Sequence, residues 1–181
     1  MVARTISGTV WFTGLPGAGK STVAQALHDL LDERGLVSFL LDGDDLREGL
    51  NADLGFEETD RRENVRRLGE VALLFARVGH LSVVSAISPY AAARKEVRDR
   101  HLAVGVRFVE VHVATPLEVC EARDPKGQYA AARRGELRLF TGISHPYEVP
   151  ESPELSLDTA GSPEAAAREV ISVLEAFPPL G

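Results

Sequence analysis

The chain has 181 residues, of which 44% are hydrophobic and 26% are charged, as is typical of a single globular domain. Its 27 acidic and 20 basic residues give a net charge of −7, which argues against a general binder of nucleic acid or of an anionic membrane surface. No apolar stretch is long enough to predict a membrane span, and the single cysteine, Cys120, has no partner for an intrachain disulfide. We therefore expect a cytoplasmic protein that captures an anionic ligand through a local cluster of cations.

Short apolar runs alternate along the chain with longer segments of helical periodicity. The helical pattern is clear where Val65, Leu68, Ala72 and Phe75 recur at spacings of three and four. Such alternation predicts an α/β fold with a doubly wound, mostly parallel five-stranded sheet and helices on both faces. The predicted strands are residues 9–13, 37–41, 81–87, 107–113 and 155–157, and the clearest predicted helices are residues 21–34, 60–78 and 162–176.

Residues 124–153 interrupt this alternation. They contain Gly127, Gly135 and Gly142, three prolines after Ser144, and several cationic side chains. Long connections with little regular structure often cover active sites, and we expect a mobile lid here. No repeat or linker divides the chain, so residues 1–181 are predicted to form one domain.

The strongest local signal follows the first predicted strand and opens the first predicted helix. Residues 14–21 fit the pattern G-x-x-x-x-G-K-[ST], in which glycines let backbone N–H groups point at phosphate oxygens beside a helix N-terminus. Lys20 is expected to reach the β- and γ-phosphates of ATP, and Ser21 to offer its hydroxyl to Mg²⁺. A glycine-rich turn without a ligand is the weaker interpretation, because lysine is scarce in this chain. The predicted ATP-binding residues are Gly14, Leu15, Pro16, Gly17, Ala18, Gly19, Lys20, Ser21 and Thr22.

Two features separate this chain from the GTPase switches that share this loop. The guanine-recognising pattern [NT]-K-x-D is absent, and the D-x-x-G match at residues 158–161 follows the last predicted strand, where we interpret it as a turn. Acidic residues for metal and substrate are instead expected from Asp42, Asp44 and Asp45, at the carboxyl end of the second strand. An exposed acidic turn that caps the next helix is the alternative interpretation.

A second anion site is predicted from arginines outside this loop. Arg47 lies one turn beyond Asp44, and Arg61 and Asn64 share a face near the start of a helix. The guanidinium fork suits phosphate and sulfate oxygens. Phe56 is either a satellite core residue or a platform for a flat base, and the sequence leaves both open.

In combination these residues resemble the adenylylsulfate kinase family, whose members transfer phosphate from ATP to the 3′-hydroxyl of adenosine 5′-phosphosulfate. The resemblance extends over residues 11–158, nearly the whole chain. The segments that carry it are Trp11-Phe12-Thr13-Gly14-Leu15, Leu41-Asp42-Gly43-Asp44, Gly49-Leu50-Asn51, Asp53-Leu54-Gly55-Phe56, Asp60-Arg61, Glu63-Asn64, Ile87-Ser88-Pro89, Thr115-Pro116-Leu117-Glu118-Val119-Cys120, Arg123-Asp124-Pro125-Lys126-Gly127, Phe140-Thr141-Gly142-Ile143 and Pro146-Tyr147-Glu148.

The resemblance implies roles for individual residues. Asp44 would help to hold Mg²⁺ or orient the attacking hydroxyl, and Arg123 and Lys126 would lie near ATP. It also raises a phosphorylated Ser88 intermediate, but no base adjoins Ser88 in the sequence, which favours direct in-line transfer. The implied catalytic residues are Lys20, Asp44 and Ser88; the metal ligands are Ser21 and Asp44; and the residues for adenosine 5′-phosphosulfate are Asp42, Arg47, Phe56, Arg61, Asn64, Ile87, Ser88 and Phe140.

The chain departs from the family pattern at Asp45, where asparagine is usual, and at Pro16 and Ala18, where serine is common. Pro16 lacks a backbone N–H, whereas the other loop residues keep theirs. The family also implies a homodimer and association with a sulfate adenylyltransferase. Two alternatives stay open: a kinase for another small anionic hydroxyl acceptor, and a catalytically silent nucleotide-binding partner of a sulfate-activating complex.

Overall fold

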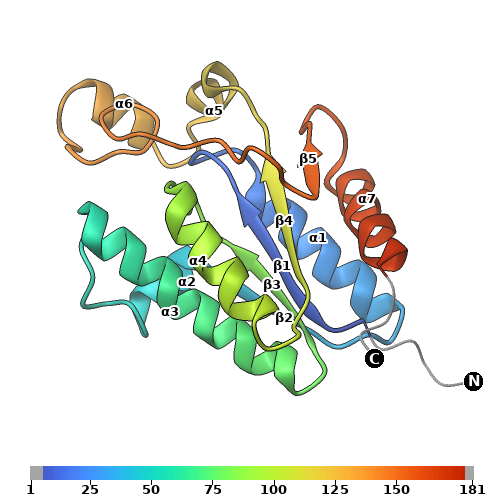
Figure 1. Ribbon diagram of the computed structural model, residues 1–181. Helices are drawn as coiled ribbons and strands as arrows, with labels where there is room; N and C mark the ends of the chain where they lie inside the picture. The colour runs from blue at the N-terminus through green and yellow to red at the C-terminus, as the bar shows by residue number, and fades with distance from the viewer. Residues whose placement is uncertain (1–5, 178–181) are drawn as a thin grey trace, which may run out of the picture.

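Five parallel strands form one sheet in the order β2-β3-β1-β4-β5 in the computed structural model of the chain, which describes residues 6–177 (Figure 1). Every predicted strand is present, and all the pairings are parallel. The register places the carboxyl ends of neighbouring strands at one edge, where α/β proteins build their sites. The strands are β1 (Gly8–Thr13), β2 (Ser38–Asp42), β3 (Leu81–Ser85), β4 (Phe108–Val113) and β5 (Leu155–Leu157).

Helices cover both faces of this sheet, as the sequence predicts (Figure 1). Alternate side chains of β1 point to opposite faces, so that Phe12 packs in the cluster of α1 and α7, and Trp11 packs in that of α3 and α4. Helix α7 begins as predicted, with the Ser162 hydroxyl accepting a hydrogen bond from the Ala165 N–H. The helices within residues 6–177 are α1 (Lys20–Glu33), α2 (Gly43–Glu48), α3 (Glu58–Arg77), α4 (Ala91–Leu102), α5 (Leu117–Arg123), α6 (Gln128–Arg133) and α7 (Pro163–Ala176).

The third strand is shorter than predicted. It ends at Ser85 rather than at residue 87, and Ser88 has a φ of 47°, in the left-handed region that side chains other than glycine seldom adopt. The apolar run therefore continues past the strand into an irregular segment. This segment brings the Ser88 hydroxyl to the Trp11 side chain of β1 instead of extending β3.

The segment predicted as a lid consists of two parts. Residues 124–145 contain α6 and cover the carboxyl edge of the sheet, whereas the part from residue 147 onward is bonded to the body of the protein. The Glu148 carboxylate accepts a hydrogen bond from the Ala91 N–H (2.6 Å), and the Glu154 carboxylate accepts one from the Glu110 N–H (2.6 Å). Mobility stays a prediction, which these bonds restrict to residues before 147.

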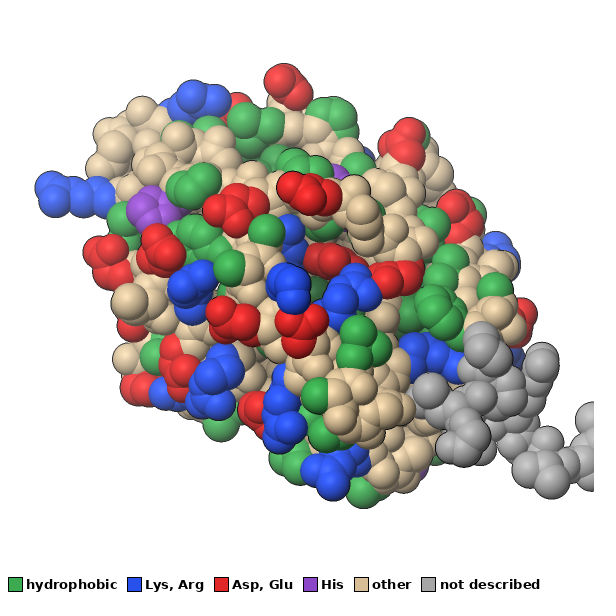
Figure 2. Space-filling view, viewed as in Figure 1, with side chains coloured by type: hydrophobic (Ala, Val, Ile, Leu, Met, Phe, Trp, Pro, Cys, Tyr) green, Lys and Arg blue, Asp and Glu red, His purple; other side chains and the backbone are tan. Residues whose placement is uncertain are grey.

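Acidic and basic side chains interleave on the face of the molecule that α3 and α4 form (Figure 2). Arg66 pairs with Glu63 (2.7 Å) and Arg62 lies 3.8 Å from Glu58, so these two arginines belong to a solvated surface. Within residues 6–177 no helix combines the length and the apolar character needed to cross a bilayer. The expected cytoplasmic setting stays a prediction.

Candidate active site

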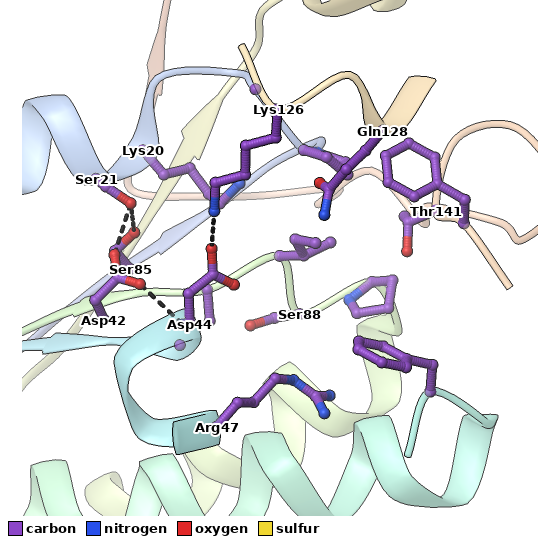
Figure 3. A pocket seen from close by; sticks show the side chains of 18 of the residues that line it. Lys20, Ser21, Asp42, Asp44, Arg47, Ser85, Ser88, Lys126, Gln128 and Thr141 are labelled. Atoms are coloured by element: carbon purple, nitrogen blue, oxygen red, sulfur yellow. Dashed lines mark hydrogen bonds and ion pairs between the residues drawn. The ribbon is translucent and has the colours of Figure 1, made fainter. Parts of the chain in front are cut away.

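A cavity of about 980 Å³ opens at the carboxyl edge of the sheet, between the glycine-rich loop and the N-terminal turns of α3, beneath residues 124–141 (Figure 3). It brings together residues from the whole length of the predicted site. Those predicted residues that line it are Pro16, Gly17, Gly19, Lys20, Ser21, Thr22, Asp42, Asp44, Arg47, Phe56, Arg61, Asn64, Ile87, Ser88, Lys126 and Phe140.

Three predicted ATP-binding residues shape the loop without lining the cavity. The Ala18 side chain is fully buried, and its N–H donates to the Leu15 carbonyl (3.2 Å). A Cβ on Gly14 would lie 2.7 Å from the carbonyl oxygen of Val113, so only glycine fits there. Gly14, Leu15 and Ala18 therefore set the curvature that Gly17 and Gly19 present to a ligand.

Lys20 lies at the start of α1 and is folded over its own loop. Its Nζ donates to the carbonyl oxygens of Gly14 (3.0 Å) and Leu15 (2.8 Å). Burial lowers the pKa of Lys20 to about 8, although the nearby carboxylates of Asp44 and Asp42 favour the charged form. The cation is thus held beside the phosphate-binding loop, and it loses its proton more readily than an exposed lysine does.

Oxygen atoms from three elements meet next to Lys20 (Figure 3). The Ser21 hydroxyl donates to Asp42 Oδ2 (2.6 Å) and lies 3.0 Å from Ser85 Oγ. The other oxygen of Asp42 accepts the Asp44 N–H (2.9 Å), so the helix-capping interpretation of the acidic turn is correct for Asp42. Asp42 can cap α2 and also take part in the site, because one carboxylate oxygen accepts the Asp44 N–H and the other accepts the Ser21 hydroxyl.

A lid residue reaches the acidic turn. Lys126 Nζ lies 2.6 Å from Asp44 Oδ2, and this pairing raises the pKa of Lys126. Both side chains are exposed, so the pair itself adds little stability. Its importance is positional, because it places a cation of residues 124–145 against the carboxylate predicted to face the reacting hydroxyl (Figure 3).

The opposite end of the cavity is aromatic and cationic. The Arg47 guanidinium lies 4.4 Å from the centre of the Phe56 ring, and the Arg61 guanidinium lies 5.6 Å from it. Phe56 is 54% exposed and belongs to none of the buried clusters of residues 6–177. This favours the platform interpretation of Phe56 over the core interpretation. Phe140 approaches from the covering segment.

Arg61 and Asn64 occupy the first turns of α3, as predicted, and both side chains are buried. Arg61 donates to the carbonyl oxygens of Phe56 (2.8 Å) and Leu139 (2.5 Å), and therefore connects the platform loop to the covering segment. Asn64 Oδ1 accepts from Asn51 Nδ2 (3.0 Å).

Ser88 is oriented by groups behind it. Its Oγ accepts a hydrogen bond from Trp11 Nε1 (3.0 Å), and its carbonyl oxygen accepts one from the buried Arg94 (2.6 Å), which also pairs with Glu110 (2.7 Å). These contacts hold the left-handed turn in place. Within residues 6–177 no carboxylate or imidazole bonds to Ser88 Oγ, so the structure offers this hydroxyl no general base.

Arg123 does not line the main cavity but lies beside the phosphate-binding loop. It lines a smaller cavity of about 210 Å³ beside the loop, together with Gly19, Thr22 and Thr159. Thr159 lies 2.5 Å from Thr115 Oγ1, which itself donates to the Ala18 carbonyl (2.7 Å). Sequence analysis missed both threonines, although their positions just after β4 and β5 could have indicated them.

Thr141 is a further site residue that sequence analysis missed. Its side chain is 1% exposed and lines the main cavity, and its hydroxyl has no hydrogen-bond partner within residues 6–177 (Figure 3). Thr141 belongs to the segment at residues 140–143, which resembles the family, but no residue pattern in that segment predicted a role for its hydroxyl.

The chain is similar to known proteins. The sequence profile of the family described as adenylylsulphate kinase matches residues 6–158. The chain belongs to the adenylylsulphate kinase family. The matched region of this family member includes every predicted site residue.

Individual relatives of this adenylylsulphate kinase family member support the same assignment. The chain is 58% identical over 149 residues to the adenylyl-sulfate kinase of Klebsiella pneumoniae, covering 82% of this chain and 73% of that protein. It is 54% identical over 167 residues to the bifunctional enzyme CysN/CysC of Mycobacterium tuberculosis, covering 92% of this chain but spanning only 27% of that protein. Among solved structures, APS kinase CysC of Mycobacterium tuberculosis in complex with AMPPNP and APS is 53% identical, with a TM-score of 0.92 and coverage of 94% of this chain and 98% of that one.

Proposed function

We propose that the chain is an adenylylsulfate kinase, which transfers the γ-phosphoryl group of ATP to the ribose 3′-hydroxyl of adenosine 5′-phosphosulfate and releases ADP and 3′-phosphoadenylyl sulfate. One observation carries the proposal: a single cavity joins the phosphate-binding loop to an aromatic and cationic end that suits a second, anionic nucleotide. The solved relative, whose structure contains both AMPPNP and APS, supports this assignment.

The loop end is proposed to bind and polarise ATP. Backbone N–H groups of the loop would bind the phosphates, and Lys20 would leave its own carbonyl partners, Gly14 and Leu15, to contact the transferring group. Arg123 would lie on the outer side of the loop, near the nucleoside. Phosphoryl transfer depends mainly on such positioning and charge neutralisation.

Magnesium is the proposed metal, and the residues fit it. The Ser21 hydroxyl and the carboxylates of Asp42 and Asp44 are hard oxygen ligands of the kind that Mg²⁺ prefers. Within residues 6–177 no three acidic, histidine or cysteine side chains gather as a metal site, which suits an ion that takes its other ligands from phosphates and water. When bound, the ion neutralises charge on the β- and γ-phosphates.

The acceptor is proposed to occupy the opposite end. Phe56 and Phe140 would enclose its base, while Arg47 and Arg61 would exchange carbonyl contacts for its anionic oxygens. Asp44 would accept the hydrogen bond of the attacking hydroxyl. Asp42, Asn64, Ile87 and Ser88 complete the proposed pocket, and the absence of a base at Ser88 supports direct transfer over a phosphoserine intermediate.

Release of ADP by the purified chain tests the proposal. With MgATP, we expect rapid release with adenosine 5′-phosphosulfate and little with AMP, adenosine or gluconate at the same concentration. Preference for another acceptor would favour the alternative of a kinase for a different small anion. No release with any acceptor, despite ATP binding, would favour the silent nucleotide-binding partner.

Assembly and setting belong to the same proposal. A homodimer is expected, and light scattering after size-exclusion chromatography would contradict it by giving the mass of one chain or of a larger assembly. The bifunctional relative, which contains a region similar to this chain, supports an association with a sulfate adenylyltransferase. Co-purification from the cytoplasmic fraction would test both the association and the setting.

A further inference from the structure

We propose that Asn51 is a positioning residue which fixes the side-chain amide of Asn64 as a hydrogen-bond donor toward the acceptor nucleotide. The inference rests on the proposed function and deepens it, because it states which kind of ligand atom Asn64 can bind. Asn51 belongs to the segment at residues 49–51, which resembles the family but has no role in the site described above.

The two amides form a buried pair behind the cavity wall. Asn51 is fully buried and does not line the cavity, whereas Asn64 is 8% exposed and lines it. Asn51 Nδ2 donates to Asn64 Oδ1 at 3.0 Å. Within residues 6–177 the side chain of Asn64 makes no other hydrogen bond, so its Nδ2 group is available to the cavity.

The pairing has a direction, which the buried environment sets. In the observed arrangement Asn51 Oδ1 is left without a partner. If both amides were reversed, Asn51 would leave an NH₂ group buried without an acceptor, and Asn64 would turn its oxygen to the cavity. Buried N–H groups without partners are rarer than buried carbonyl groups without partners. The pair therefore favours Asn64 as a donor.

A donor at this position selects its ligand. Arg47 and Arg61 at the same end of the cavity also donate, so this end recognises atoms that accept hydrogen bonds: anionic oxygens or ring nitrogens. An amide with its oxygen turned to the cavity would instead repel them. Asn51 thus acts on specificity through Asn64 without touching the ligand.

A double-mutant cycle tests this. Asn51→Leu removes the amide, and the backbone bonds of the loop remain, since the Asn51 N–H donates to the Leu46 carbonyl and the Asn51 carbonyl accepts from the Leu54 N–H. We expect the KM for adenosine 5′-phosphosulfate to rise about 10-fold with the KM for ATP unchanged. In an Asn64→Leu background the same change should alter KM less than about 2-fold, because the residue through which it acts is gone.

Several outcomes would overturn the inference. Equal effects of Asn51→Leu in both backgrounds, or an equal rise in both KM values, would show that Asn51 supports the loop rather than Asn64. If Asn51→Leu greatly lowers the melting temperature, Asn51→Ala, which also lacks the amide, replaces it in the cycle, and the same two outcomes would overturn the inference. Leu50→Ala is the matched control, because Leu50 is exposed in the same loop.

Competition by AMP and adenosine locates the bound atom. A weaker inhibition by AMP alone in the Asn51→Leu variant would assign the donor to the anionic group, and an equal weakening for both would assign it to the base. No change for either inhibitor would overturn the inference. If the wild-type chain fails to turn over adenosine 5′-phosphosulfate, the proposed function fails, whereas normal turnover without an effect of Asn51→Leu refutes only the role of Asn51.

Discussion

The two ends of the cavity are built in different ways. The phosphate-binding end comes from one continuous stretch between β1 and α1, and Lys20 bonds to carbonyls of its own loop. The acceptor end gathers side chains from segments far apart in the sequence, and Arg61 bonds to both the Phe56 loop and residue Leu139. The phosphate-binding end depends on local structure and the acceptor end on tertiary structure, so substitutions at the two ends should change different kinetic constants.

The largest effect is expected at the local end. Lys20→Ala should lower kcat by roughly 1,000-fold, because it removes the cation that neutralises the transferring group while the loop backbone remains. Steady-state ADP release would measure it. Lys95→Ala is the matched control, since Lys95 is exposed and pairs with Asp99 on α4. A loss below 10-fold would contradict the role of Lys20.

The second-largest effect tests whether the two ends of the cavity bind their substrates separately. Arg61→Ala should raise the KM for adenosine 5′-phosphosulfate by about 100-fold, as expected for a lost charge-assisted hydrogen bond, and leave the KM for ATP nearly unchanged. Arg62→Ala, at an exposed neighbouring position, should change neither constant. An equal loss of both substrates in Arg61→Ala would mean that the ends do not act separately.

Affinity for nucleotide should depend on pH through the local end. The pKa of Lys20 is lowered to about 8, so its charge is present below this pH and is lost above it. The dissociation constant of ADP should therefore rise toward about 10-fold per pH unit above 8, as titration calorimetry would show. Lys20→Arg, which stays charged, should remove this dependence. A flat wild-type profile would contradict the shifted pKa.

The smallest effect is expected between the two ends. Ser88→Ala should retain turnover within about 10-fold, because the hydroxyl bonds to Trp11 and no carboxylate or imidazole within residues 6–177 bonds to it. Mass spectrometry of the wild-type chain during turnover should detect no phosphoserine. Complete loss of activity together with a phosphorylated Ser88 would replace direct transfer with a two-step mechanism.

Much of the fold was predictable because its signals are local. Strands and long helices follow from apolar periodicity, and the glycine-rich loop follows from its pattern between a strand and a helix. The end of β3 was not, because Ser88 has a left-handed conformation and its contacts with Trp11 and Arg94 come from other elements of the fold. The bounds of helix α4 were not predicted, and the bonds of Glu148 and Glu154 could not be predicted either, because their partners are distant in sequence.

By itself the sequence determined the parallel α/β fold, the phosphate-binding loop, and the residue types needed at both ends of the cavity. Tertiary structure decided which residues meet: Lys126 against Asp44, Arg123 in a separate cavity, and Asn51 behind Asn64. The physical reason is that backbone geometry and periodicity act over a few residues. A contact between residues far apart in the sequence, in contrast, depends on where the packing of the whole sheet places its two partners.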